Sequence, residues 1–328
     1  MGKVGPALAA GNTLVAKPSP NAPLAVSLAL ETIAKFFPPG AINVVNGDGD
    51  VGPTLTRHPL VRMVSFTGGT RTGKAVMASA AESIKNVALE LGGNDAAIVL
   101  DDIEPEAVVD ELIKGIFARS GQVCYAIKRV YVPARRLAHF RDALCSAIDQ
   151  FRIGHGLDER STLAPMNNRS QFDIVRGLVE RARQGGAVVT ELGTALEPDR
   201  WGDGYYMKPT VVTGLANDAE LVGAEQFGPV IPVVGYDSED EALSFANNTE
   251  YGLGSSLWTR DTDRALALAS RVEAGITFIN SHARTKLGEM HMPFGGIKQS
   301  GIGRVRTEVG LAEFVEHHAI SLNRTTVR

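Results

Sequence analysis

The stretch Arg62-Met63-Val64-Ser65-Phe66-Thr67-Gly68-Gly69-Thr70-Arg71-Thr72-Gly73 joins an apolar run to a helical pattern through a pair of glycines. We expect a strand over 62–66 and a helix from about residue 72. Glycines in such a turn let the backbone approach a pyrophosphate, and the helix N-terminus offers free N–H groups and a positive dipole end. A tight strand-to-helix turn without a ligand accounts for the same residues equally well.

Short apolar runs alternate with helical patterns on both sides of this stretch. Val26, Leu30, Ile33 and Phe37 recur at helical spacing before a Pro-Pro-Gly breaker. Strand–helix alternation at this pitch implies parallel pairing, right-handed crossovers and an open α/β sheet. The glycine pair in Leu91-Gly92-Gly93 marks the expected boundary between two α/β units. Further strands are expected over 13–16, 42–45, 87–89, 96–100, 129–132, 230–234 and 276–279, and helices over 105–118, 137–151, 239–247 and 262–272.

Composition limits the classes of partner. The 328 residues suffice for about two domains. A net charge of −4 gives no electrostatic reason to expect nucleic acid or an anionic membrane. Two cysteines are too few for a disulfide framework, so free thiols in a reducing compartment are expected. Because there is neither a transmembrane-length apolar run nor a signal-peptide pattern, we expect a cytoplasmic protein.

The two cysteines have different surroundings. Cys124 follows Ser120-Gly121-Gln122-Val123 in a polar loop near helix ends, where a thiol can be held partly as thiolate for nucleophilic catalysis. The alternative is a small buried hydrophobe, which is the commoner fate of a lone cysteine. Cys145 fits that alternative, since it adjoins Leu144 on an amphipathic helix.

Two charged residues lie where strands are expected to end. Desolvation of Glu90 at the end of its apolar strand would raise its pKa, as a base working near neutrality requires, unless the side chain faces solvent or caps a helix. Sequence alone does not show whether Glu90 meets Cys124. Lys17 ends the first strand, where α/β sheets bind ligands, and either holds a ribose or phosphate or is solvated. The histidines show no zinc spacing, so we expect no metal.

Seven stretches, taken in order, resemble the successive signatures of the aldehyde dehydrogenase superfamily, and the match runs from residue 2 to about 320. They are Gly5-Pro6-Ala7-Leu8-Ala9-Ala10-Gly11-Asn12-Thr13, Lys17-Pro18, Phe66-Thr67-Gly68, Leu89-Glu90-Leu91-Gly92-Gly93, Gly121-Gln122-Val123-Cys124, Glu225-Gln226-Phe227-Gly228-Pro229-Val230, and Pro293-Phe294-Gly295-Gly296 with Lys298-Gln299-Ser300-Gly301.

The resemblance implies an α/β fold in three parts. Residues 1–91 would be the C-terminal part of a Rossmann-like dinucleotide-binding domain, and 92–303 an α/β catalytic domain with the thiol nucleophile. Residues 304–328 would form a return segment and a C-terminal oligomerisation strand. The stretch 316–327 is similar to the family's bridging strand, which joins a neighbouring subunit's sheet, so a homo-dimer or homo-tetramer is implied for the full-length protein; a frayed tail is the alternative.

The resemblance also implies a reaction. Cys124 would attack an aldehyde carbonyl to give a thiohemiacetal, whose oxygen is held by donors that include the Cys124 backbone N–H. Hydride would pass to the nicotinamide of NAD or NADP and leave a thioester. Glu90 would then deprotonate water to release a carboxylic acid. Because relatives that acylate coenzyme A generally lack this base, Glu90 favours hydrolysis.

The implied cofactor contacts have separate roles. Lys17 would bind the adenosine ribose, the glycines from Gly68 to Gly73 would flank the pyrophosphate, Glu225 would bind the nicotinamide ribose, and Phe227 would pack beside the nicotinamide. The complete set is Lys17, Gly68, Gly69, Gly73, Leu91, Glu225 and Phe227.

Four departures from the family pattern stand out. Pro20 occupies the position where NAD-preferring members often carry a Glu that repels a 2′-phosphate, so we hypothesise relaxed or NADP-leaning cofactor choice. Asn94 replaces a common Lys, Gly69 a common Ser, and Val305 a common Glu.

Family members also carry an N-terminal portion that lies upstream of the matching residues, with a Pro-Trp-Asn segment that supplies an oxyanion donor. Loss of one such donor costs about 10²–10³ in turnover, so we expect the chain as given to reduce NAD(P)⁺ very poorly. The alternatives are a non-catalytic remnant that serves as a binding or oligomerisation module, and an unrelated cysteine hydrolase on an α/β scaffold. The aldehyde is not readable, although loop 282–292 is the stretch expected to line its pocket.

Overall fold

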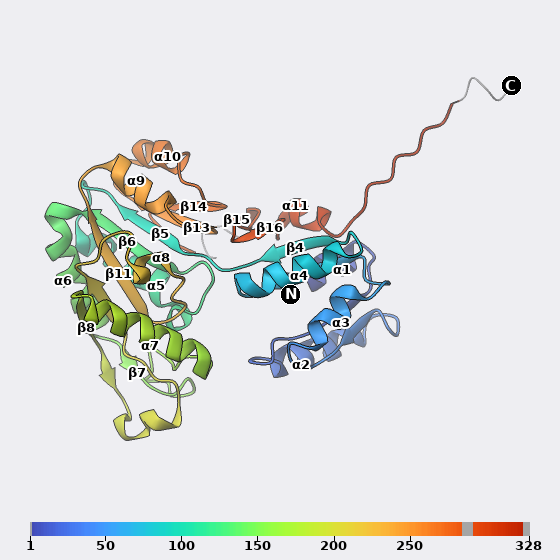
Figure 1. The fold of residues 1–328 in the computed structure, drawn as a ribbon, viewed down its shortest axis with the longest axis horizontal. Coiled ribbons are helices and arrows are strands. Elements are labelled where there is room, and N and C mark those ends of the chain that lie inside the picture. The colour runs from blue at the N-terminus through green and yellow to red at the C-terminus, as the bar shows by residue number, and fades with distance from the viewer. Residues whose placement is uncertain (1, 284–290, 324–328) are drawn as a thin grey trace.

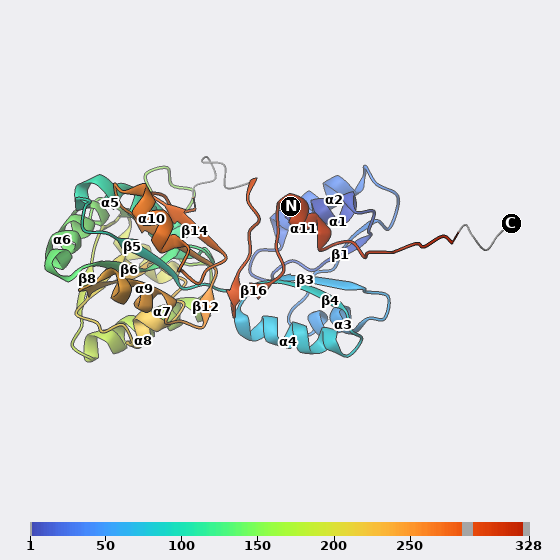
Figure 2. The ribbon, with the colours of Figure 1, turned by 90° about the horizontal axis from the view of Figure 1, so that it is seen from above.

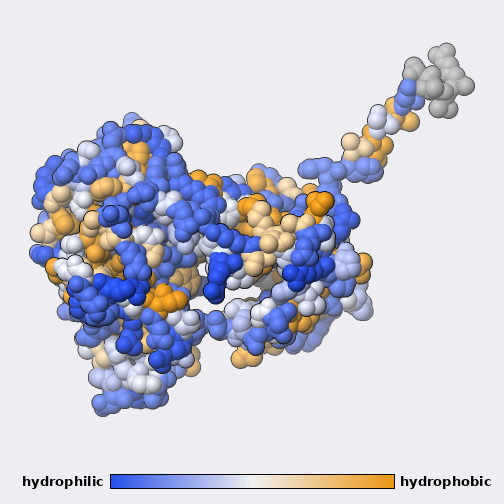
Figure 3. Space-filling model, viewed as in Figure 1, coloured by the Kyte–Doolittle hydropathy of each residue, from blue (hydrophilic) through white to orange (hydrophobic). Residues whose placement is uncertain are grey.

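The computed structural model describes residues 2–283 and 291–323. Figures 1 and 2 show two lobes joined where β4 (Asn86–Glu90) is followed by β5 (Asp95–Val99). In the space-filling view of Figure 3, an opening separates the lobes beside this connection. After α11 (Thr307–Ala312) the chain contacts the smaller lobe as far as Glu316, which pairs with Arg62, and from there to residue 323 it leads away from both lobes.

The smaller lobe is built from short parallel strand pairs with helical crossovers. β1 pairs with β2, and β3 pairs with β4, each in parallel. A late segment, β16 (Gly301–Ile302), adds an antiparallel strand to β4, so residues that we assigned to the second unit hydrogen-bond to the first. The remaining elements are α1 (Val4–Ala9), β1 (Leu14–Ala16), α2 (Leu24–Ala34), β2 (Ile42–Val44), α3 (Val51–Arg57), β3 (Met63–Thr67) and α4 (Thr70–Ala81).

The larger lobe contains a seven-stranded sheet in the order β14-β13-β5-β6-β11-β10-β8. Every neighbouring pair is parallel except β8 with β10, which is antiparallel at the edge. The predicted α/β class with a parallel-sheet core is confirmed. The sheet strands besides β5 are β6 (Ile127–Pro133), β8 (Val188–Glu191), β10 (Thr210–Thr213), β11 (Val230–Tyr236), β13 (Gly254–Trp258) and β14 (Ile276–Ile279).

Helices cover both faces of this sheet, which explains why β5 and β6 are buried along their whole length. Helices α5 and α6 pack on one face, and α7, α8, α9 and α10 pack on the other. Their bounds are α5 (Pro105–Phe117), α6 (Leu137–Ile148), α7 (Arg169–Gln184), α8 (Glu220–Gly223), α9 (Glu239–Asn247) and α10 (Thr262–Ala269). Short pieces complete the lobe: η1 (Ala118–Gly121), η2 (Ala134–Arg136), β7 (Arg152–Ile153), β9 (Thr194–Ala195), η3 (Pro198–Asp203), β12 (Tyr251–Gly252) and β15 (Ile297–Lys298).

Some elements lie outside the apolar runs that predicted the rest. Helix α7 is the longest helix of the described chain, and between its many polar residues an apolar stripe packs against the sheet: Phe172, Val175, Leu178, Val179 and Ala182. Strand β13 begins Gly254-Ser255-Ser256, residues that rarely indicate a strand.

The predicted bridging strand over 316–327 has no strand in residues 316–323, and the remainder lies outside the described residues. A bridging strand would pair only with a second chain, so it stays a prediction. Within the part of the chain that the structure describes, no helix could cross a membrane and no side-chain group could hold a metal ion.

Candidate active site

Glu90 is the last residue of β4, at the edge of the smaller lobe that faces the larger one. Its backbone pairs with Thr67 of β3 and Gly301 of β16, which fixes it between two neighbouring strands. The side chain is buried, with only 8% of the residue exposed. Its Oε1 atom lies against Gly295, because a Cβ placed on that glycine would be 3.1 Å from it.

Cys124 lies in the loop between η1 and β6, and the backbone of this loop is unusual. Arg119, Ser120 and Gly121 all have φ in the left-handed region, at 49°, 59° and 73°. Only glycine fits at position 121, because a Cβ there would lie 2.2 Å from the carbonyl oxygen of Gly228. Two signature stretches that lie about a hundred residues apart therefore meet backbone to backbone beside the thiol.

Polar side chains hold this loop in place from outside. The Ser120 hydroxyl donates to the Ala164 carbonyl at 2.7 Å, and the Gln122 side-chain oxygen accepts from the Asn167 backbone N–H at 3.0 Å. Such bonds offset the cost of left-handed backbone at non-glycine residues, which is of order 1–3 kcal/mol each. The strained turn is thus anchored to a neighbouring segment of the larger lobe.

The Phe294–Gly295 segment lies beside both candidate catalytic residues. Cys124 and Tyr125 pack against an apolar cluster that contains Phe294, whose ring centroid is 5.1 Å from that of Tyr125. The next residue, Gly295, contacts the Glu90 carboxylate. Glu90 also contributes to the raised pKa of the Cys124 thiol. The fold therefore brings two residues that are far apart in the sequence to the same short segment.

Burial dominates the ionisation of both groups. It raises the pKa of the Cys124 thiol to about 11, although the Lys128 ammonium and the backbone N–H of Tyr125 favour the thiolate. Our expectation of a partly ionised thiol in a polar loop was therefore wrong, because desolvation outweighs these two contributions. Burial likewise raises the pKa of Glu90 to about 7, against the opposing charges of Lys3, Arg304 and Arg306. A protonated thiol thus lies near a carboxyl group that titrates close to neutrality.

Four of the predicted cofactor residues gather where β3 and β4 end and α4 begins. Gly68 and Gly69 form the turn, and α4 has no side-chain cap, so its first N–H groups are free of side-chain partners. Gly73 allows close packing of the helix on the strand, because a Cβ there would lie 2.5 Å from the Leu91 side chain. An anion such as a pyrophosphate fits this turn.

The other three predicted cofactor residues lie apart from that turn. The Lys17 ammonium donates to the Gly47 carbonyl at 2.8 Å, at the end of β1. Glu225 accepts from the Gly93 backbone N–H at 3.1 Å, and burial raises its pKa. Phe227 has a left-handed φ of 50°, and its ring faces the Lys128 ammonium. Glu225 and Phe227 thus lie beside the lobe connection, on the side of Cys124.

Sequence reasoning missed four ionisable residues around this site. Lys3 is partly buried; its ammonium is buried without a hydrogen-bond partner, and this burial lowers its pKa to about 8. Asp95, Lys128 and His282 are almost wholly buried. The available signal was the charged pair Lys128-Arg129 inside an otherwise apolar strand, where each charge requires a partner.

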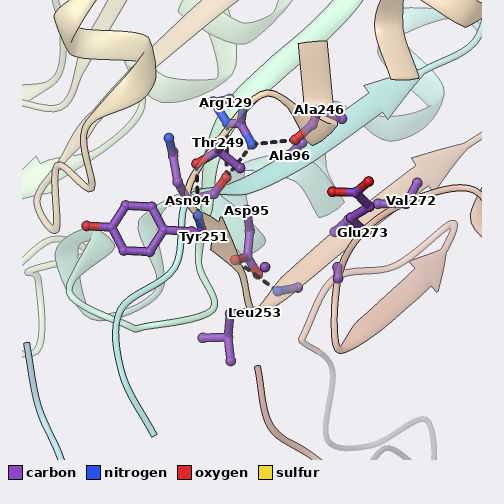
Figure 4. A pocket seen from close by; sticks show the side chains of 14 residues that line it. Asn94, Asp95, Ala96, Arg129, Ala246, Thr249, Tyr251, Leu253, Val272 and Glu273 are labelled. Carbon is purple, nitrogen blue, oxygen red and sulfur yellow. Dashed lines mark hydrogen bonds between the residues drawn. The ribbon is translucent and has the colours of Figure 1, made fainter. Parts of the chain in front are cut away.

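A small pocket lies behind the lobe connection, as Figure 4 shows. Arg129 donates there to the Asn94 and Ala246 carbonyls, and the Asp95 carboxylate accepts from the Gly254 N–H. The cavity has a volume of about 10 Å³, room for about one water molecule, so it does not hold a cofactor or an aldehyde.

Comparison with known proteins identifies the family. The family model of the aldehyde dehydrogenase family matches residues 1–320. The chain belongs to the aldehyde dehydrogenase family. It is 38% identical over 313 residues to the betaine aldehyde dehydrogenase of Brucella anthropi, covering 95% of this chain and 64% of that protein. The corresponding enzyme of Rhizobium etli is also 38% identical, with coverage of 96% and 64%.

Solved structures of aldehyde dehydrogenases share the fold. A mutant of aldehyde dehydrogenase C from Pseudomonas syringae, in complex with NAD⁺ and octanal, superposes with a TM-score of 0.91 at 34% identity, covering 96% of this chain and 64% of that one. Betaine aldehyde dehydrogenase from Staphylococcus aureus, in complex with NAD⁺, gives 0.90 at 35% identity, with coverage of 95% and 62%. The chain therefore spans just under two thirds of the length of these relatives.

We expect Gly121→Ala to disrupt the Cys124 loop, because a methyl group would collide with the Gly228 carbonyl at a left-handed backbone position. The unfolding free energy should fall by about 1–3 kcal/mol, and Cys124 should lose its fixed position. Urea denaturation followed by circular dichroism measures the first effect. Gly52→Ala is the control, because a Cβ at Gly52 meets open space in α3. If Gly121→Ala were as stable as Gly52→Ala, the close contact between Gly121 and the Gly228 carbonyl would be contradicted.

Proposed function

We propose that this protein oxidises an aldehyde to a carboxylic acid with NAD⁺ or NADP⁺, with Cys124 as nucleophile and Glu90 as general base. One observation carries the proposal: the buried Glu90 carboxyl group and Cys124 both lie against the Phe294–Gly295 segment, and burial raises the pKa of Glu90 to about 7. A base is most effective when its pKa lies near the working pH. Membership of the aldehyde dehydrogenase family supports the same reaction.

In the first half-reaction, Cys124 loses its proton to the Glu90 carboxylate, directly or through one water. The sulfur then forms a bond to the aldehyde carbon, and the carbonyl oxygen becomes an oxyanion. Backbone N–H groups of the Cys124 loop would donate hydrogen bonds to that oxygen. The Tyr125 N–H, which favours the thiolate, belongs to the same loop.

The second half-reaction restores the thiol. When bound, the nicotinamide supplies the hydride acceptor that turns the thiohemiacetal into a thioester. Glu90 first releases the Cys124 proton to solvent, and its carboxylate then takes a proton from water while the hydroxide adds to the thioester carbon. The carbon–sulfur bond breaks, which releases the carboxylic acid, and the departing thiolate takes the proton back from Glu90 to restore the Cys124 thiol.

The cofactor would be held by residues from both lobes. The uncapped N-terminus of α4 suits the pyrophosphate, Lys17 and Glu225 suit the two riboses, and Phe227 suits the nicotinamide face. Relatives from Pseudomonas syringae and Staphylococcus aureus hold NAD⁺ in their solved structures.

The relatives include enzymes named for betaine aldehyde and one solved with octanal, which differ in charge and length. Loop 282–292, which we expect to line the aldehyde pocket, lies mostly outside the described residues. We further propose a cytoplasmic homo-oligomer, supported by two free cysteines and by the apolar side chains of Ile320 and Leu322, exposed by 85% and 73%.

An activated ester tests the two catalytic residues without a cofactor. We expect para-nitrophenyl acetate to acetylate Cys124 of the chain. In Glu90→Gln, loss of the acetyl group should slow by about 10²–10⁴, because water loses its base. Peptide-resolved mass spectrometry follows the acetyl group, and Cys124→Ala is the blank. Acetylation confined to Cys145, or turnover that survives in Cys124→Ala, would refute the nucleophile.

The rate constant for loss of that acetyl group should rise with pH through about 7 and then level off. Glu90 accepts a proton only as a carboxylate. Because its pKa is raised to about 7, only about a tenth of the Glu90 side chains are ionised at about pH 6. Lys3→Met should move the midpoint to higher pH, because the Lys3 ammonium favours the carboxylate. Stopped-flow or quenched mass measurements across the range give the profile. A midpoint near 4.5, or no shift in Lys3→Met, would be inconsistent with a desolvated base.

Pro20 bears on the choice between cofactors. It offers neither a carboxylate to bind a ribose hydroxyl nor a charge to repel a 2′-phosphate, so we expect NADP⁺ to bind within about tenfold of NAD⁺. Pro20→Glu should weaken NADP⁺ selectively through charge repulsion. Titration calorimetry measures both dissociation constants, and a preference for NAD⁺ above tenfold in the unsubstituted chain would count against the idea.

A further inference from the structure

Lys128 has an environment that the reaction described above does not use. It lies on β6, where it is buried with 2% of the residue exposed. Its ammonium donates to the carbonyl oxygens of Val123 at 2.9 Å, Cys124 at 3.0 Å and Ala126 at 3.3 Å. All three N–H groups of the ammonium therefore point at the loop that carries the nucleophile.

The opposite side of Lys128 faces the residues proposed to contact the cofactor. Its ammonium lies 5.9 Å from the centre of the Phe227 ring, over the ring face. The carboxylates of Asp95 and Glu225 interact with it electrostatically and oppose the effect of burial on its pKa. The charge thus lies between the nucleophile loop, β5 and the Glu225–Phe227 segment.

The charges around the Cys124 sulfur come from several elements and have opposite signs. Lys128 on β6 favours the thiolate, whereas Asp95 on β5 and Glu90 on β4 disfavour it. The imidazole Nε2 of His282, next to β14, is 2.7 Å from the Tyr125 carbonyl and 3.7 Å from an Asp95 oxygen. Among the described residues, Lys128 is the cation that favours the thiolate, and its ammonium is hydrogen-bonded to the backbone carbonyl of Cys124 itself.

We propose that Lys128 is a positioning residue for the nucleophile: its ammonium fixes the Cys124 loop through three carbonyls and stabilises the thiolate by its charge. The inference rests on the proposed role of Cys124. A thiolate that forms in a desolvated site needs a nearby cation, because water is not there to solvate it. Three carbonyl acceptors and two carboxylates offset the desolvation of the cation itself.

The test is the rate of alkylation of each cysteine in the full chain by iodoacetamide at about pH 8, resolved by peptide mass spectrometry. Lys128→Met removes the ammonium, and Cys124 alkylation should fall about three- to tenfold, since fewer molecules are ionised while each thiolate is somewhat more nucleophilic. Asp95→Asn removes an opposing charge and keeps an oxygen acceptor for the Gly254 N–H, so the rate should rise by about threefold. Cys145 is the internal reference in every variant.

Lys114→Met is the matched control, because that lysine forms an exposed ion pair with Glu111 on α5. It should leave both cysteines unchanged. A merely structural lysine gives the opposite sign: a looser loop would expose Cys124 and speed its alkylation in Lys128→Met, and Asp95→Asn would have no effect. Either result would overturn the proposal.

Cys145 alkylation reports whether Lys128→Met folds correctly. If Cys145 is alkylated faster in that variant, the fold is perturbed, and the alkylation rates of Cys124 in Asp95→Asn and Lys128→Arg then test the proposal. The arginine variant keeps the charge and should retain at least half of the Cys124 rate, and a tenfold loss there would contradict the charge role. Acetylation by the ester separates the proposed role of Cys124 from the proposed role of Lys128. If Cys124 is acetylated but its alkylation rate is the same in the Lys128 and Asp95 variants, only the inference about Lys128 fails.

Discussion

Water is largely excluded from Glu90 and Cys124, and this desolvation sets the chemistry of the site. Burial raises the pKa of both groups, which leaves a neutral thiol and a carboxyl group that exchanges its proton near neutrality. In the proposed reaction the two groups depend on each other, because the thiol needs a base and the base needs a proton donor. The positive charge of Lys3 limits the rise in the pKa of Glu90, and the positive charge of Lys128 limits the rise in the pKa of Cys124.

The architecture serves to keep these two groups together. Glu90 ends a strand of the smaller lobe, while the Cys124 loop precedes a central strand of the larger sheet. The Phe294–Gly295 segment lies beside both Glu90 and Cys124. Gly121 lets the Cys124 loop contact Gly228. Glycine recurs at these contacts because any Cβ would occupy space that a neighbouring backbone or carboxylate already fills. Motion of one lobe relative to the other would therefore change the chemistry directly.

Much of the fold was predictable because apolar periodicity is a local signal. Strand β14 and helix α9 have the predicted bounds, and the parallel α/β class follows from the alternation of such elements. Helix α7 and strand β13 were missed, since polar residues dominate the first and Gly-Ser-Ser begins the second. The structure of β13 comes from pairing between β5 and β14, which no local pattern contains, whereas α7 carried a local signal in the Asn168 cap and the helical spacing of its apolar residues.

The candidate site could be predicted in its residues, which stay predictions, but not in its electrostatics. Ordered motifs indicated Glu90 and Cys124 as candidates, yet the polar loop around Cys124 suggested a thiolate, whereas burial raises the pKa of that thiol. The roles of Lys3 and Lys128 depend on contacts between residues distant in sequence or on burial, which only the fold supplies.

Infrared difference spectroscopy on the chain, with Glu90→Gln subtracted, would observe the carboxyl stretching band of that side chain during a pH titration. Desolvation predicts that the protonated band disappears with a midpoint near pH 7, as the raised pKa of Glu90 requires. A midpoint near 4.5, the ordinary value for a solvated glutamate, would show that the base is not buried beside the nucleophile.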